Sequence, residues 1–105
     1  MRRYEVLISD RANDDMEAIY NYIAETLLAP DSAGKQYDRI AEAILSLEQI
    51  PKRMKIMDSE PERSKGLRAL RVDNYTVFFT INAEKIYIAR VLFSASDISK
   101  RLSEE

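Results

Sequence analysis

LRALRVDNYTVFFTINAEKIYIARVLF, residues 67–93, contains three apolar runs separated by two turn signals. Their alternation predicts three strands joined by short turns: 67–72, 75–81 and 85–93. In the second run, Tyr75, Val77, Phe79 and Ile81 share one face, which we expect to be the core face. The third run is apolar on both parities, which predicts a central position in the sheet.

Upstream of these strands the apolar period becomes helical. A short strand is expected over 4–9, followed by a helix from Arg11 that Ser9 and Asp10 can cap. The segment 30–32 (Pro-Asp-Ser) should break this helix and cap a second one, which ends before Pro51. Two helices joined by so short a link should pack as an antiparallel hairpin.

These elements predict a single α+β domain over residues 1–105, with the order β-α-α-β-β-β. The helix hairpin packs on one face of a largely antiparallel four-stranded sheet, and a short C-terminal helix follows over 98–103. The other face of the sheet is expected to stay partly open. Residues 51–65 are polar and charged, and we interpret them as a long loop, a kind of segment that is often functional.

The composition excludes several kinds of chemistry. The chain has no Cys and no His, which excludes a thiolate nucleophile, a Cys-based metal site and the usual general base. With only two glycines it has no Gly-rich phosphate loop. We therefore expect no cofactor and no metal. The apolar run near the N-terminus is too short for a signal peptide, and we expect a cytoplasmic protein.

Arginines are the strongest candidates for function. Arg68 and Arg71 are three apart on a strand and should point to opposite faces. Arg90 stands in an otherwise apolar strand, so it needs an acidic partner such as Asp97 or Asp73, or it grips an anion. Early in the first helix an acidic group is interpreted as solvated rather than as a metal cluster: Asp14, Asp15 and Glu17.

An ordered set of short motifs resembles the RelE/ParE toxin superfamily. The motifs are Gly66-Leu67-Arg68 and Asn74-Tyr75 in the first two runs, then Arg90-Val91-Leu92 and Asp97-Ile98, all after two helices. The resemblance covers nearly the whole chain. It implies a toxin of a type II toxin–antitoxin (plasmid stabilisation) module, neutralised by a cognate antitoxin. RelE-like members cleave messenger RNA in the ribosome, and ParE-like members poison DNA gyrase.

The ending of the last strand is closer to the ParE-like branch, which implies a gyrase-binding toxin rather than an enzyme. Two positions depart from the family. The arginine that usually follows the tyrosine of the middle strand is Thr76, and the basic pair after the last strand is replaced within Ser94-Ala95-Ser96. The partner-binding candidates, together with the basic loop 52–65, are Arg68, Arg71, Arg90, Phe93 and Asp97.

Two alternatives stay open. The first is a metal-independent, ribosome-dependent endoribonuclease of RelE type, whose site would comprise Lys65, Arg68, Arg71, Tyr75 and Arg90. The second is a degenerate, non-toxic binding module, which the departures at 76 and 94–96 motivate. The expected partners are the antitoxin and the gyrase or ribosome target. A second copy of the chain, in a homodimer, is a further candidate partner.

Overall fold

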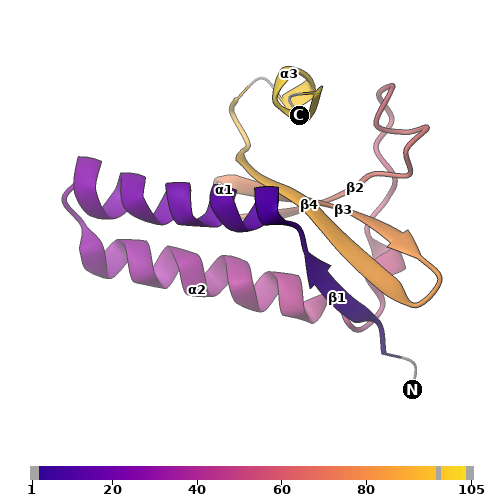
Figure 1. Ribbon diagram of the computed structural model, residues 1–105, viewed down its shortest axis with the longest axis horizontal. Helices are drawn as coiled ribbons and strands as arrows, with labels where there is room; N and C mark the ends of the chain where they lie inside the picture. The colour runs from indigo at the N-terminus through magenta and orange to yellow at the C-terminus, as the bar shows by residue number, and fades with distance from the viewer. Residues whose placement is uncertain (1–2, 97, 104–105) are drawn as a thin grey trace.

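The computed structural model describes residues 3–96 and 98–103, so the prediction for Asp97 lies outside the described residues. Figure 1 shows a helical hairpin beside a four-stranded sheet, with a short C-terminal helix on the other side. The elements are β1 (Glu5–Ile8), α1 (Asp10–Asn21), the π-helical turn η1 (Tyr22–Thr26), α2 (Pro30–Ser46), the 3-10 turn η2 (Pro51–Arg53), β2 (Arg68–Val72), β3 (Tyr75–Asn82), β4 (Lys85–Phe93) and α3 (Ile98–Ser103). The predicted α+β fold and element order are confirmed.

The strands form one sheet in the order β1-β4-β3-β2. β1 is parallel to β4, and the other pairs are antiparallel. β4 therefore lies in the interior of the sheet, as its apolar character on both parities predicted. The two hairpin turns place Asp73 (φ 56°) and Ala83 (φ 57°) in the left-handed region, where short hairpin turns commonly place a residue.

A β-bulge in β4 changes which face its side chains occupy. Phe78 pairs with Arg90 while the next residue, Phe79, pairs with Ile88, so Ala89 is the extra residue. Before the bulge Ile88 faces the helical hairpin, and after it Val91 does. The bulge thus puts Arg90 on the same face as Phe78, although strict alternation from Ile88 would put it on the face of the main core.

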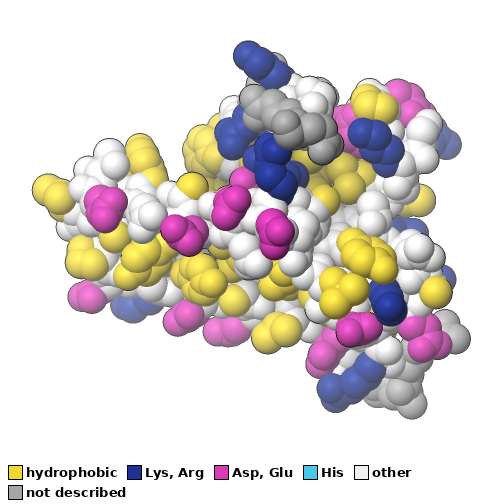
Figure 2. All heavy atoms as spheres, in the orientation of Figure 1, with side chains coloured by type: hydrophobic (Ala, Val, Ile, Leu, Met, Phe, Trp, Pro, Cys, Tyr) yellow, Lys and Arg dark blue, Asp and Glu magenta, His cyan; other side chains and the backbone are white. Residues whose placement is uncertain are grey.

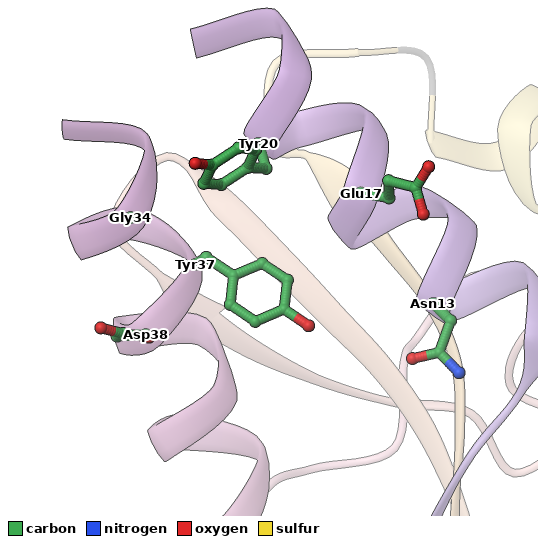
Figure 3. Close-up of a pocket in the computed structure, with 6 residues that line it drawn as sticks. All are labelled: Asn13, Glu17, Tyr20, Gly34, Tyr37 and Asp38. Atoms are coloured by element: carbon green, nitrogen blue, oxygen red, sulfur yellow. The ribbon is translucent and has the colours of Figure 1, made fainter. Parts of the chain in front are cut away.

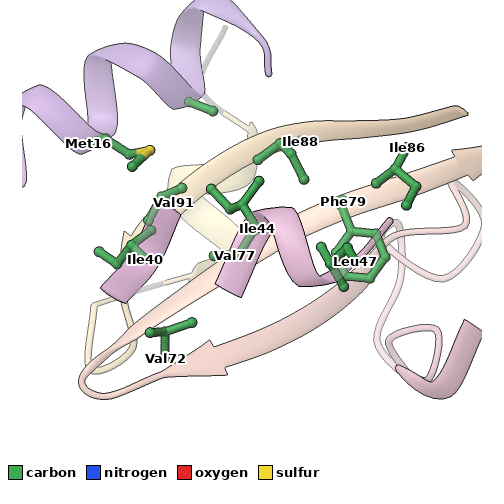
Figure 4. Close-up of a cluster of buried hydrophobic side chains, with 11 residues drawn as sticks. Met16, Ile40, Ile44, Leu47, Val72, Val77, Phe79, Ile86, Ile88 and Val91 are labelled. Atoms are coloured by element: carbon green, nitrogen blue, oxygen red, sulfur yellow. The ribbon is translucent and has the colours of Figure 1, made fainter. Parts of the chain in front are cut away.

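The main core lies between the hairpin and the sheet, on what we call the hairpin face. Figure 4 shows side chains from α1 and α2 packed over those of the strands. The members are Ala12, Met16, Ile40, Ile44, Leu47, Val72, Val77, Phe79, Ile86, Ile88 and Val91. Val77 and Phe79 are fully buried here, and Tyr75 and Ile81 pack against the cluster, so the predicted core face of β3 is correct.

The opposite face is covered only over its centre and stays partly open, as predicted: Arg71 is exposed there and Tyr87 is 40% exposed. Phe78 is 2% exposed and forms a second cluster with Leu67 and Leu92. Ile98 and Leu102 of α3 pack on this cluster, as does Met57 of the segment that precedes β2. The spacing of Ile98 and Leu102 puts both on one side of a helix, which is what lets so short a helix cover the sheet.

The helix boundaries follow local chemistry, with two corrections. Ser9 caps α1, because its Oγ accepts a hydrogen bond from the Ala12 amide at 3.0 Å. Pro30 is the first residue of α2 and Ala29 is its N-cap, so the side chains of 31 and 32 do not cap it as predicted. α1 begins at Asp10 rather than at Arg11, and α2 ends at Ser46, before Pro51 as predicted.

Candidate functional site

The two arginines of β2 point to opposite faces, as their spacing predicted. Arg68 pairs with Phe79 and so lies on the hairpin face, while Arg71 pairs with Thr76 on the opposite face. Arg68 is half-buried and donates a hydrogen bond to the Met54 carbonyl. Arg71 is exposed, and its Nε donates to the Asp73 carbonyl at 3.0 Å. Of this pair, Arg71 presents more of its surface to a partner.

Arg90 is buried at the edge of β4, with 8% of its surface exposed. Its Nε and Nη2 donate to the two carboxylate oxygens of Asp15 at 2.7 and 3.0 Å, a bidentate pair. Its Nη1 donates to the carbonyl of Arg101 in α3 at 3.0 Å. The guanidinium therefore joins α1, β4 and α3.

The partner of Arg90 differs from the sequence-based expectation. Asp15 was interpreted as solvated, but its side chain is 11% exposed and forms the ion pair. Asp73, one of the two expected partners, instead accepts hydrogen bonds from Arg39 and Gln36 of α2. A buried arginine in an apolar strand signalled that some carboxylate was needed, but not which of the helical acids would reach it.

Asp15 also accepts a hydrogen bond from the backbone of β4 at a point beyond the end of β1. β1 pairs with β4 only as far as Ile88, and the Ser9 amide and hydroxyl then donate to the carbonyls of Ile88 and Ala89. Beyond that point the Val91 amide donates to Asp15 Oδ2 at 2.9 Å. α1 thus satisfies the edge of β4 where β1 has ended.

A neutral polar pair occupies the positions where the family resemblance implied basic residues. Thr76 Oγ1 and Ser94 Oγ share a hydrogen bond of 2.7 Å on the opposite face. The Ser96 hydroxyl donates to the Phe93 carbonyl at 2.6 Å. These three hydroxyl side chains form local hydrogen bonds, and none of them can supply the positive charge that would stabilise a phosphorane.

Tyr75 and Phe93 are paired across β3 and β4 and form an edge-to-face contact with ring centroids 5.9 Å apart. Burial raises the pKa of the Tyr75 hydroxyl above its ordinary value of 10.0, and the charge of Tyr22 raises it further. Phe93 is 48% exposed. This aromatic pair lies on the hairpin face and extends an apolar surface toward solvent.

The predicted nuclease residues do not share one site. Arg68 and Tyr75 lie on the hairpin face, and Arg71 lies on the opposite face. Lys65 and Arg90 line one cavity of about 350 Å³ beneath α3. Catalysis by these five residues would require them to converge on one phosphate.

A second cavity lies outside the core, between α1 and α2. Its volume is about 480 Å³, and its polar lining includes Asn13, Glu17 and Asp38 (Figure 3). Tyr20 and Tyr37 meet edge-to-face across it, with ring centroids 6.4 Å apart. Gly34 opens space on α2, since a Cβ there would meet no atom within 4 Å.

The described part of the chain offers neither an acidic metal site nor a membrane-spanning helix. Across residues 3–96 and 98–103, no three acidic side chains come together in a way that could hold a metal ion. Within the same ranges, no helix has the length and apolar character needed to cross a membrane.

The geometry defines an α+β protein whose candidate residues are divided between the two faces of one sheet. A family model described as the ParE toxin of the type II toxin–antitoxin system parDE matches residues 6–98. The chain therefore belongs to the ParE toxin family of type II toxin–antitoxin systems. No curated protein sequence matches it.

Solved structures share the fold. The chain is similar to a chain of the chromosomal ParDE system from P. aeruginosa, with 24% identity, a TM-score of 0.72, and coverage of 87% of this chain and 96% of that one. It is also similar to a chain of the RelBE2 toxin–antitoxin complex from Mycobacterium tuberculosis, with 21% identity, a TM-score of 0.64, and coverage of 91% and 97%. At these identities the likeness shows the fold alone.

Proposed function

We propose that this protein is the toxin of a plasmid-stabilising module, that a cognate antitoxin neutralises it in the cytoplasm, and that it arrests growth by binding DNA gyrase. The observation that carries the proposal is the match to ParE toxins over residues 6–98. Both similar structures come from toxin–antitoxin systems, which supports an antitoxin as the first partner.

The placement of the candidate side chains favours binding over RNA cleavage. An endoribonuclease without a metal needs positioned cations and a base for the 2′-hydroxyl. Here the cations are divided between two faces, and the Thr76–Ser94 pair occupies the positions expected to be basic. A toxin that acts by binding needs no such convergence.

The exposed residues among the candidates are the ones we assign to contact. Arg71 and Phe93 present a cation and an aromatic ring, a combination that is common in protein interfaces. Arg90 is assigned a positioning role, because Asp15 and the Arg101 carbonyl enclose its guanidinium. Arg68 is half-buried and donates to the Met54 carbonyl, so it is less exposed than Arg71 and more exposed than Arg90.

The tip of the helical hairpin is a further apolar surface for the antitoxin. Figure 1 shows the hairpin projecting past the sheet. Leu28 is 81% exposed, and Leu27 and Tyr22 are each more than half exposed. Contiguous exposed apolar patches are uncommon on monomeric soluble proteins, and they often mark protein–protein contact sites.

The test is expression of the chain alone from a tightly controlled promoter, followed by growth curves and two reactions with the purified, folded protein. We expect growth arrest, inhibited supercoiling by gyrase and intact messenger RNA in a translation extract. Arrest with cleaved messenger would establish the RelE-type alternative instead. Absence of arrest would favour the degenerate binding module.

Two matched variants sharpen this test. Arg71→Gln removes the exposed cation on the opposite face and should weaken gyrase inhibition about tenfold, which corresponds to the loss of one charge-assisted contact. Lys85→Gln, which removes an exposed cation at the start of β4 that is outside the partner-binding candidates, serves as the control and should leave inhibition within about twofold. Equal effects of both changes would show that Arg71 makes no specific contact.

A further inference from the structure

The cavity beneath α3 has a lining of mixed chemistry that the proposed function does not use. Its walls come from the start of α1, the segment before β2, β3, β4 and α3. Figure 2 shows the hollow between α3 and the segment before β2, with hydrophobic side chains at its base. The volume of about 350 Å³ falls within the range of small-molecule sites.

Positive charge dominates this lining. Among the described residues, the lining holds three cations, Arg11, Lys65 and Arg90, and one acid, Glu62. The charge of Arg90 is balanced by Asp15, and the Glu62 carboxylate, itself buried, accepts a hydrogen bond from Ser59 at 2.9 Å. Arg11 and Lys65 are exposed, and the described residues give neither of them an ion pair. Two cations from distant parts of the chain are therefore available at the cavity.

The rest of the lining supplies one hydroxyl donor and an apolar floor. Thr80 contributes the hydroxyl group, because the hydroxyls of Ser9 and Ser103 already donate to the carbonyls of Ala89 and Lys100. The apolar surface comes from Leu67, Ala89 and Leu102. A phosphate monoester carries close to two negative charges at neutral pH and has three acceptor oxygens, more than a carboxylate has. Two cations beside the Thr80 hydroxyl suit such a group, because charge-assisted hydrogen bonds are the strong ones.

We propose that the cavity beneath α3 binds a small organic phosphate, with its phosphoryl group toward Arg11 and Lys65 and its apolar body against Leu67, Ala89 and Leu102. The site is independent of the proposed toxin function. The cavity between α1 and α2 provides the internal contrast, since its charged lining residues are Glu17 and Asp38 and it should repel the same ligand.

The test is titration of the purified full chain with phenyl phosphate, followed by amide chemical shifts. We expect saturable binding with shifts at Leu67, Thr80, Ala89 and Leu102, and no shifts at Tyr20 or Tyr37. Inorganic phosphate, phenol and benzoate form the comparison arms. Each should bind at least about tenfold more weakly, because each lacks the apolar body, the charge or the phosphoryl group.

Matched variants locate the site. Arg11→Gln and Lys65→Gln should each weaken phenyl phosphate binding about tenfold, and both are exposed positions where the fold tolerates change. Lys55→Gln removes a cation of the same segment that does not line the cavity, and it should leave the affinity unchanged. The proposal is overturned by absence of saturable binding, by benzoate binding as tightly as phenyl phosphate, or by Lys55→Gln weakening binding as much as Lys65→Gln.

Discussion

Both faces of the sheet carry buried side chains, but they are covered to different extents. On the hairpin face, two long helices pack over a continuous apolar cluster. On the opposite face, a six-residue helix and an irregular segment cover a cluster of three buried side chains. The first arrangement secures the fold. The second leaves room for a cavity and for exposed polar groups, so this is the face on which function can vary without loss of the core.

Adjacent phenylalanines of β3 lie on opposite faces, so their substitution tests this difference between the faces. Phe79→Ala opens the main core and should cost about 4 kcal/mol of unfolding free energy. Phe78→Ala should cost about 3 kcal/mol, because α3 and the segment before β2 can partly collapse onto the site. Urea unfolding measures both values.

Native-state hydrogen exchange separates the two variants further. In the Phe78 variant the amides of α3 should lose protection before those of the sheet, whereas in the Phe79 variant protection should fall throughout. A Phe78 variant that loses protection uniformly would show that the two faces form one cooperative unit.

The link between the faces should give the next largest effect. Asp15→Asn leaves the Arg90 guanidinium buried without its counter-charge and should cost about 3 kcal/mol. Asp14→Asn, an exposed acid on the same helix, is the control and should change stability by no more than about 0.5 kcal/mol. Adding Arg90→Gln to Asp15→Asn should recover part of the loss, and strictly additive effects would contradict a direct pair.

The exposed ion pair on the hairpin side should matter less. Hydrogen bonds from Arg39 and then Gln36 hold the pKa of Asp73 below its ordinary value of 3.8. The stability that this pair contributes is therefore present above pH 3.8 and is lost as the pH falls through the lower, folded-state pKa. Arg39→Gln should raise the Asp73 pKa toward 3.8, as followed by carboxyl NMR. An unchanged pKa would show that Gln36 alone suffices.

The smallest effect is expected at the rim of the hairpin face. Burial, with a smaller contribution from Tyr22, raises the pKa of Tyr75 above 10.0. The folded state then holds its proton more tightly than the unfolded chain, so stability is full below pH 10.0 and is lost as the pH rises through the folded-state pKa. Tyr22→Phe should lower the Tyr75 pKa slightly in an absorbance titration, and a rise would contradict this arrangement.

Much of the fold was predictable because its signals are local. The period-two runs of 67–93, the helical stripes and the Ser9 cap all act over a few residues, and each matches the structure closely. The bulge at Ala89 was not predictable, since a strand that is apolar on both parities hides a change of face. The packing of α3 on the sheet was not predicted, although the spacing of Ile98 and Leu102 places both on one side of a helix.

The candidate site was harder to predict, because its contacts join distant positions. Asp15 and Arg90 are 75 residues apart, and nothing in the sequence distinguishes Asp15 from the neighbouring acids of α1. Their meeting depends on α1 running along the edge of β4 after β1 ends. The roles of Arg68, Arg71, Arg90 and Phe93 in partner binding stay predictions, now ordered by exposure.

Plasmid supercoiling by purified gyrase in the presence of the folded chain, beside a translation extract that receives the same preparation, is the decisive measurement. A gyrase-binding toxin should inhibit supercoiling while ribosome-bound messenger RNA stays intact. Uninhibited gyrase with cleaved messenger would contradict it.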